Sequence, residues 1–278
     1  MRRERVADDI YIFTSELYAQ VTAGLVVTPQ GAVLIDTMVF PEEARMINRF
    51  VQERLNTTVK FVINTHYHAD HTYGNCFFAN AIIVGHEICY QLLNEIGRAG
   101  LTEAKQSSSV FDEVEICLPN IVFNDSSVEL RLSGKTLELE HLPGHSPDSI
   151  TVYVREDRVL FAGDLLMPIP FFVDGSFDDF RQSLMRIKGR GYENVIQGHG
   201  DVILRGEIED KIDEDLSYLS QIEAYASKAL SERKPYDFLE TIDVEKVGKS
   251  RILLNGGVES LHQQNLRILY DHLASAEK

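Results

Sequence analysis

The chain has 278 residues, 44% hydrophobic and 25% charged, enough to bury the core of one large or two small globular domains. Its 27 basic and 43 acidic residues give a formal charge of −16, which disfavours nucleic acid and anionic membranes as partners. Three cysteines (Cys76, Cys89 and Cys117) lack the spacing of a disulfide framework or a thiolate zinc site. No apolar run resembles a signal segment or a membrane span, so we expect a cytoplasmic protein.

The first half of the chain alternates between strand and helix patterns. Pro41 and two following acidic residues begin a predicted helix that ends near Leu55 and buries Met46 and Ile47. A turn at 29–31 joins two of the predicted strands into a hairpin. The apolar runs predict strands at residues 10–13, 21–28, 32–36, 59–64 and 81–84.

The second half begins with the least regular segment, residues 98–120, for which we expect a mobile flap or a loose helix. Beyond it the pattern is mainly of strands, and from residue 206 onward it is helical. Because several strands are joined by hairpins, two sheets with helices outside fit better than one doubly wound parallel sheet. The strands are predicted at 121–123, 127–132, 136–141, 149–155, 158–162 and 194–197, with a helix at 177–188.

A cluster of three histidines and an aspartate within six positions follows the apolar strand at 59–64. In extended backbone, residues two apart point the same way, so His66 and His68 can bind one ion. A turn into a helix would bring Asp70 and His71 toward a second ion. Neutral imidazole and carboxylate are ligands of Zn²⁺, Mn²⁺ and Fe²⁺. A polar loop without metal is disfavoured, because packing these groups together is costly without a cation.

Three further residues follow predicted strands, each beside a glycine: His145, Asp164 and His199. A single histidine or aspartate in a loop is usually only solvated. Functional residues gather in loops that a rigid scaffold positions, however, and strands of adjacent sheets end together. With the first cluster, these residues predict a metal site.

The order of these residues, an HxHxDH motif followed by a lone His, a lone Asp and a final His, resembles the metallo-β-lactamase superfamily. The resemblance covers residues 10–205 and is strongest to the glyoxalase-II-like members. It implies an α+β fold, a four-layer αββα sandwich. The catalytic domain would be residues 1–205, and residues 206–278 would form a helical C-terminal extension packed on it.

The resemblance also implies a binuclear metallohydrolase with two divalent ions, Zn²⁺ first, with Mn²⁺ and Fe²⁺ as alternatives. A hydroxide between the ions would be the nucleophile, because bound divalent ions bring the pKa of water near 7. Asp70 could also relay a proton as a catalytic residue. The implied ligands are His66, His68 and His145 for the first metal and Asp70, His71 and His199 for the second, with Asp164 bridging.

Other residues near these motifs have simpler interpretations. His262 replaces the final histidine in some members, but His199 between two glycines fits the loop better, so we expect His262 to be structural. Asp36 ends a strand and is expected to accept hydrogen bonds from ligands rather than to bind metal. Tyr67 lies between two ligands and is expected to pack.

An apolar stretch containing Met167, Phe171, Phe172 and Phe177 follows Asp164 and is expected to overhang the metals, with residues 13–20 opposite. The alternative is that these aromatics are core.

The favoured substrate is a small ester, thioester, lactone or amide with an apolar portion. The competing activity is a mononuclear-iron thiol or persulfide dioxygenase of the same fold. The apolar helical tail offers a surface for a homodimer.

Overall fold

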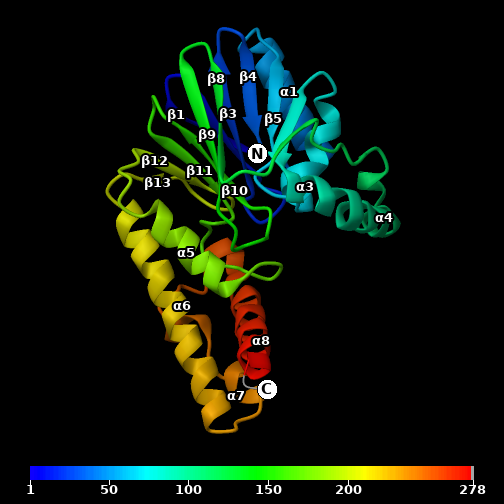
Figure 1. Ribbon diagram of the computed structural model, residues 1–278. Coiled ribbons are helices and arrows are strands. Elements are labelled where there is room, and N and C mark those ends of the chain that lie inside the picture. Colours follow the sequence, from blue (N-terminus) through cyan, green and yellow to red (C-terminus); the bar gives the residue numbers. More distant parts are fainter. Residues whose placement is uncertain (277–278) are drawn as a thin grey trace.

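Two stacked β-sheets form the centre of the computed structural model, which describes residues 1–276 (Figure 1). In the first sheet the strands follow chain order. Strands β1 to β4 pair antiparallel, and β4 to β7 pair parallel. They are β1 (Arg2–Ala7), β2 (Ile10–Thr14), β3 (Thr22–Thr28), β4 (Gly31–Ile35), β5 (Val59–Ile63), β6 (Ile82–His86) and β7 (Ile121–Phe123).

The second sheet has the order β13-β12-β11-β10-β9-β8. Strands β8 to β11 form an antiparallel meander, β12 lies parallel to β11, and β13 closes the edge antiparallel to β12. These strands are β8 (Ser127–Leu132), β9 (Lys135–His141), β10 (Ile150–Val154), β11 (Val159–Gly163), β12 (Asn194–Gln197) and β13 (Ile203–Leu204).

The core between the sheets is built from alternate residues of their facing strands. Ile12, Val33 and Ile63 of the first sheet pack in one cluster with Leu139 and Val152 of the second. Because successive side chains of a strand point to opposite faces, the remaining apolar residues are left to pack against helices. Each sheet therefore buries both of its faces.

Helices cover the two outer faces. On the first sheet, Ile47 and Val51 of α1 (Pro41–Glu53) pack with Leu34. On the second sheet, Leu184 of α5 (Phe177–Ile187) packs with Leu160. This is the αββα sandwich that the sequence predicted. The prediction for Met46 was wrong: it is 44% exposed, on the outer side of α1.

The segment at 98–120 is more regular than the sequence indicated. A π-helical turn, η2 (Leu93–Gly97), joins α3 (Glu87–Leu92) to α4 (Arg98–Ser107), and η3 (Ser109–Phe111) follows. The buried side chains Leu93 and Leu101 hold these turns against the body of the protein. Only the part from Asp112 to Asn120 lacks helix or strand.

Beyond the second sheet the chain is helical, with α6 and α8 side by side (Figure 1). Leu219 of α6 and Leu266 of α8 join the same core cluster as Phe180 of α5. The division at residue 205 stays a prediction. No helix within residues 1–276 is both long and apolar enough to span a membrane. The elements here are α6 (Ile208–Ser231), α7 (Asp237–Glu240), η4 (Val244–Val247), η5 (Leu253–Gly256) and α8 (Val258–Ala276).

Candidate metal centre

The seven residues singled out in the sequence converge at one end of the two sheets. The HxHxDH segment follows β5 and turns into the short helix α2 (Ala69–Thr72), while the other three follow β9, β11 and β12. Their imidazole nitrogens and carboxylate oxygens form three groups, in each of which the atoms lie within 4.8 Å of one another. The groups are His66, His68 and His145; His66, His71 and Asp164; and Asp70, His71 and His199.

The side chain of Asp36 aligns two of the histidines. His71 Nδ1 lies 2.9 Å from Asp36 Oδ2, so its Nε2 faces the cluster. Asp36 also accepts hydrogen bonds from the backbone N–H and the hydroxyl of Thr65, at 2.8 and 2.7 Å. The Thr65 hydroxyl in turn lies 3.0 Å from His66 Nδ1. The prediction that Asp36 accepts a hydrogen bond beside the candidate ligands is confirmed at His71.

Backbone carbonyls align two more histidines. His145 Nδ1 donates to Phe171 O at 2.6 Å, and His199 Nδ1 donates to Ala19 O at 2.8 Å. Each bond uses Nδ1 as the donor and directs Nε2 toward the cluster. Both carbonyls lie in loops far from the histidines in the sequence, which no local pattern could indicate.

His68 is oriented the other way round. Its Nε2 lies 2.8 Å from Asp174 Oδ2, an oxygen that also accepts a hydrogen bond from Tyr67 OH at 2.7 Å. Its Nδ1 lies 3.0 Å from His66 Nε2 and 2.9 Å from His145 Nε2. Three nitrogens thus face one point. Sequence reasoning missed Asp174, which is separated from His68 by 106 positions.

Asp164 lies at the middle of the cluster. Its Oδ1 is 3.3 Å from His71 Nε2, and its Oδ2 is 3.3 Å from His145 Nε2 and 3.4 Å from His199 Nε2. Both Asp164 Oδ1 and His71 Nε2 are buried without a hydrogen-bond partner. Buried polar atoms are costly unless satisfied, and a divalent cation between them would satisfy both. The donor set therefore fits metal ions.

Charge is divided unevenly within the metal-free cluster. Burial opposes protonation of His199, but Asp164 and Asp70 outweigh burial and raise its pKa to about 10. Burial is likewise outweighed at His71, mainly by Asp164, and the pKa rises well above its usual value. Burial lowers the pKa of His145 to about 4. At neutral pH the metal-free His199 is therefore cationic and pairs with the carboxylates of Asp70 and Asp164.

A cleft of about 310 Å³ opens over these residues. Tyr18 and Ala19 form one wall, and Met167 and Phe171 another, as the sequence predicted. Phe172 and Phe177 are instead buried in the core. Sequence reasoning missed the contribution of the helical C-terminal region. The full lining is Tyr18, Ala19, His68, Ala69, Asp70, His145, Asp164, Met167, Phe171, His199, Leu254 and Leu261.

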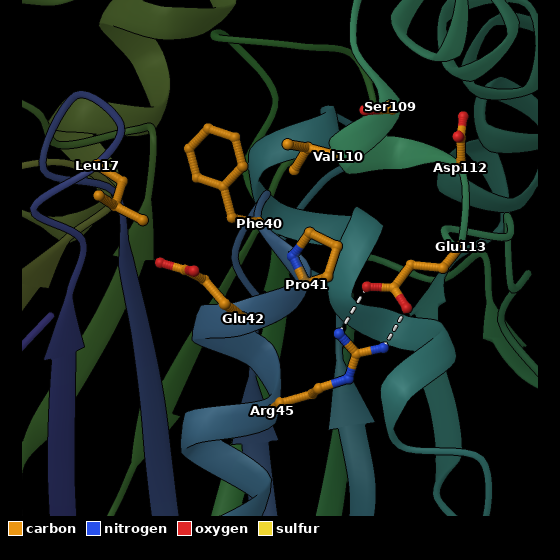
Figure 2. Close-up of a pocket in the computed structure, with 9 residues that line it drawn as sticks. All are labelled: Leu17, Phe40, Pro41, Glu42, Arg45, Ser109, Val110, Asp112 and Glu113. Atoms are coloured by element: carbon orange, nitrogen blue, oxygen red, sulfur yellow. Dashed lines mark hydrogen bonds and ion pairs between the residues drawn. The ribbon is translucent and has the colours of Figure 1, made fainter.

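A larger groove of about 730 Å³ lies beyond the loop that carries Leu17 (Figure 2). The ring of Tyr18, which lines the cleft, packs edge-on against Phe40, which lines the groove, at 6.4 Å between centroids. The basic group of the groove, Arg45, is paired with Glu113 in a fork (Figure 2). No candidate ligand lines the groove, so the reactive groups belong to the cleft alone.

His262 takes no part in the cluster. His262 lies on α8. Its Nδ1 accepts a hydrogen bond from Tyr218 OH at 3.0 Å, and its Nε2 donates to Ile242 O at 2.9 Å. Both ring nitrogens are used, and the side chain is fully buried. The structural interpretation of His262 is confirmed.

Comparison with known sequences identifies relatives. The chain is 25% identical over 179 residues to the beta-lactamase-like protein 2 homolog of Caenorhabditis elegans, covering 64% of this chain and 54% of that protein. It is 25% identical over 156 residues to a hydroxyacylglutathione hydrolase of Pelagibacter ubique, covering 55% and 56%. The chain thus spans about half the length of these curated relatives.

The fold has counterparts among solved structures. The stereoselective inverting sec-alkylsulfatase Pisa1 from Pseudomonas sp. superposes with a TM-score of 0.76 at 16% identity, over 97% of this chain and 50% of that one. At this identity the likeness shows the fold alone, including the helical C-terminal region. Residues 18–243 match the model of a single family, described as the metallo-beta-lactamase superfamily. With that match over most of its length, and with the metallo-β-lactamase fold, the chain belongs to this superfamily.

Proposed function

We propose that the chain is a binuclear metallohydrolase that cleaves a small ester, thioester, lactone or amide. The observation that supports this most directly is the convergence of five imidazoles and two carboxylates in three overlapping groups of possible ligand atoms. Two divalent ions bound there would lower the pKa of water to near 7 and polarise the scissile carbonyl. Zn²⁺ is the first choice for this donor set, with Mn²⁺ and Fe²⁺ as alternatives.

The directions of the side-chain nitrogens and oxygens support a proposed position for each residue. His66 Nε2, His68 Nδ1 and His145 Nε2 would hold the first ion, because they face one another at about 3 Å. Asp70, His71 and His199 would hold the second ion. Asp164 would bridge, because its two oxygens face histidines of both positions.

Asp70 is proposed as the proton acceptor of the reaction. Its carboxylate lines the cleft and lies 3.3 Å from His199 Nε2. Burial alone would raise the pKa of Asp70, but His71 and His199 outweigh burial and lower it. The group is therefore ionised at neutral pH and faces the space where substrate and water meet.

The lining of the cleft supports the proposed substrate class. Apart from the candidate ligands, the lining that residues 1–276 provide is apolar or aromatic and contains no lysine or arginine. Within residues 1–276 no lysine or arginine of the cleft would pair with a substrate carboxylate or phosphate, whereas an alkyl or acyl group would bury against Met167, Phe171 and Leu261. We propose a small, largely apolar substrate. We further propose that the protein acts in the cytoplasm as a homodimer, with no nucleic-acid or membrane partner.

The test is the metal content of the purified protein, followed by a screen of lactone, thioester, ester, phosphoester and β-lactam substrates. We expect two ions per chain and hydrolysis of an uncharged substrate, lost on chelation and restored by Zn²⁺. Substrates that differ only by a carboxylate on the acyl group should be cleaved more slowly. One iron per chain with oxygen consumption would support the dioxygenase instead.

Metal binding is expected to release at least one proton per chain at pH 7 to 8. The raised pKa of His199, about 10, means that the metal-free ring carries a proton that a metal must displace. The stability that this charge contributes is fully present below the usual pKa of 6.5 and is lost as pH rises through about 10. Metal affinity should therefore rise with pH, about tenfold per unit for each proton displaced.

Zinc titration in weak buffer with a pH indicator measures this release directly. Calorimetry in two buffers of different ionisation enthalpy checks the number of protons. Binding of two ions without proton release would show that the histidines are neutral in the metal-free protein.

A further inference from the structure

We infer that Asn265, on helix α8, is a positioning residue for His145, acting through the backbone on both sides of Phe171. The inference rests on the proposed metal centre and adds to it a role for the helical C-terminal region. His145 and Asn265 are 120 positions apart, and Phe171 is the link between them.

The Asn265 side chain clamps the residues on either side of Phe171. Its Nδ2 donates to Pro170 O at 2.6 Å, and its Oδ1 accepts from the Phe172 N–H at 3.4 Å. Between these two bonds, Phe171 O accepts the hydrogen bond from His145 Nδ1 at 2.6 Å. One amide side chain thus fixes the direction in which the Phe171 carbonyl points.

A buried network fixes the amide in turn. Asn265 Nδ2 also donates to Tyr218 OH at 3.1 Å, and Tyr218 OH donates to His262 Nδ1 at 3.0 Å. Asn265, Tyr218 and His262 are all fully buried. Because His262 Nε2 donates to Ile242 O, its Nδ1 must accept, and each hydrogen-bond direction in the network follows.

The Phe171 carbonyl lies in a loop that packs into the core through Leu166, Ile169 and Phe172 but has no regular backbone pairing. Residues 164–176, between β11 and α5, contain neither helix nor strand. Lys211 of α6 holds the start of this loop by donating to Met167 O at 2.8 Å, and Asn265 holds its middle. If the carbonyl turned, His145 would lose the bond that directs its Nε2 toward His68.

The two metal positions differ in this respect. His145 would belong to the first position, and the hydrogen bonds of Asn265 within residues 1–276 do not reach the groups that align the second. His71 is aligned by Asp36, and His199 by Ala19 O. Loss of the clamp should therefore weaken the first position selectively.

The experiment compares Asn265→Leu, which keeps the branched shape and removes all three bonds, with Tyr218→Phe. The Tyr218 variant removes a hydroxyl from the same network but leaves the bonds to residues 170–172 in place. Zinc dissociation constants are measured by chelator competition on metal-free protein, and thermal midpoints monitor folding. We expect Asn265→Leu to weaken the first position about 10- to 100-fold and to leave the second unchanged. Tyr218→Phe should lower the midpoint while retaining both affinities within about twofold.

The outcomes separate this inference from the proposed function. Wild-type protein that binds no metal would overturn both. Two-metal binding by the wild type with unchanged affinities in Asn265→Leu would overturn the positioning role alone. Equal losses at both positions, or the same loss in Tyr218→Phe, would mean a structural effect and also overturn it. If Asn265→Leu does not fold, Asn265→Ser replaces it and must show the same selective loss.

Discussion

Replacing Asp164 with asparagine is expected to lower kcat/KM by about a thousandfold or more and to reduce the metal content below two ions per chain. The carboxylate is 5% exposed, and its two oxygens face His71, His145 and His199 at 3.3 to 3.4 Å. Asparagine keeps the shape, removes the charge and turns an NH₂ group toward atoms that should face a cation. Removing the shared charge costs several kcal/mol of transition-state stabilisation, and each 1.36 kcal/mol is tenfold in rate.

Elemental analysis and steady-state kinetics on the best substrate of the screen measure both effects. Asp213→Asn is the matched control, because it removes the same charge from the surface of α6, where Asp213 is paired with Lys188. The control should keep full metal content and activity. An Asp164→Asn variant with two tightly bound ions and ordinary turnover would show that Asp164 does not bridge the metals.

The sequence predicted those parts of the site that depend on local spacing. His66, His68, Asp70 and His71 lie within six positions, so the strand and the turn that follow from the sequence already determine their directions. The residues that align the ligands were not predicted beyond Asp36. Asp174 reaches His68, and Asn265 reaches the Phe171 loop, only because the chain folds back over distances that leave no pattern in the sequence.

The fold shows the same dependence on context. Strand β1 was missed because its run Arg2–Ala7 is charged and largely exposed; its backbone pairing with β2, not burial, makes it a strand. Met46 was placed in the core because the apolar stripe of α1 can be drawn on either side of Ile47. The sheet decides which side is buried, and Met46 faces out.

Gly198→Ala is expected to cause the second-largest loss, lowering kcat/KM by about 100-fold or more together with the loss of at least one metal ion. A Cβ at this position would overlap Asp164 Oδ1 and would lie 2.8 Å from the carbonyl carbon of Gly163. The backbone cannot retreat, because Gly198 N donates to Gly163 O at 2.8 Å and Gly198 O accepts from Thr22 N at 2.8 Å. The carboxylate must therefore move away from the histidines, and overpacking should cost about 1–3 kcal/mol of stability.

Gly206→Ala is the matched control. It adds the same methyl group at a position where a Cβ meets no atom within 4 Å, so any loss specific to Gly198→Ala comes from where the methyl group is placed. Zinc affinity, kcat/KM and the thermal midpoint are compared for the two variants and the wild type. A lowered midpoint alone would report overpacking, whereas a loss of metal at a temperature where the variant is folded reports the displaced carboxylate. Normal zinc affinity in folded Gly198→Ala would show that metal binding does not depend on the position of the Asp164 carboxylate. The close packing of Gly198 against Asp164 would then serve the fold and not the chemistry.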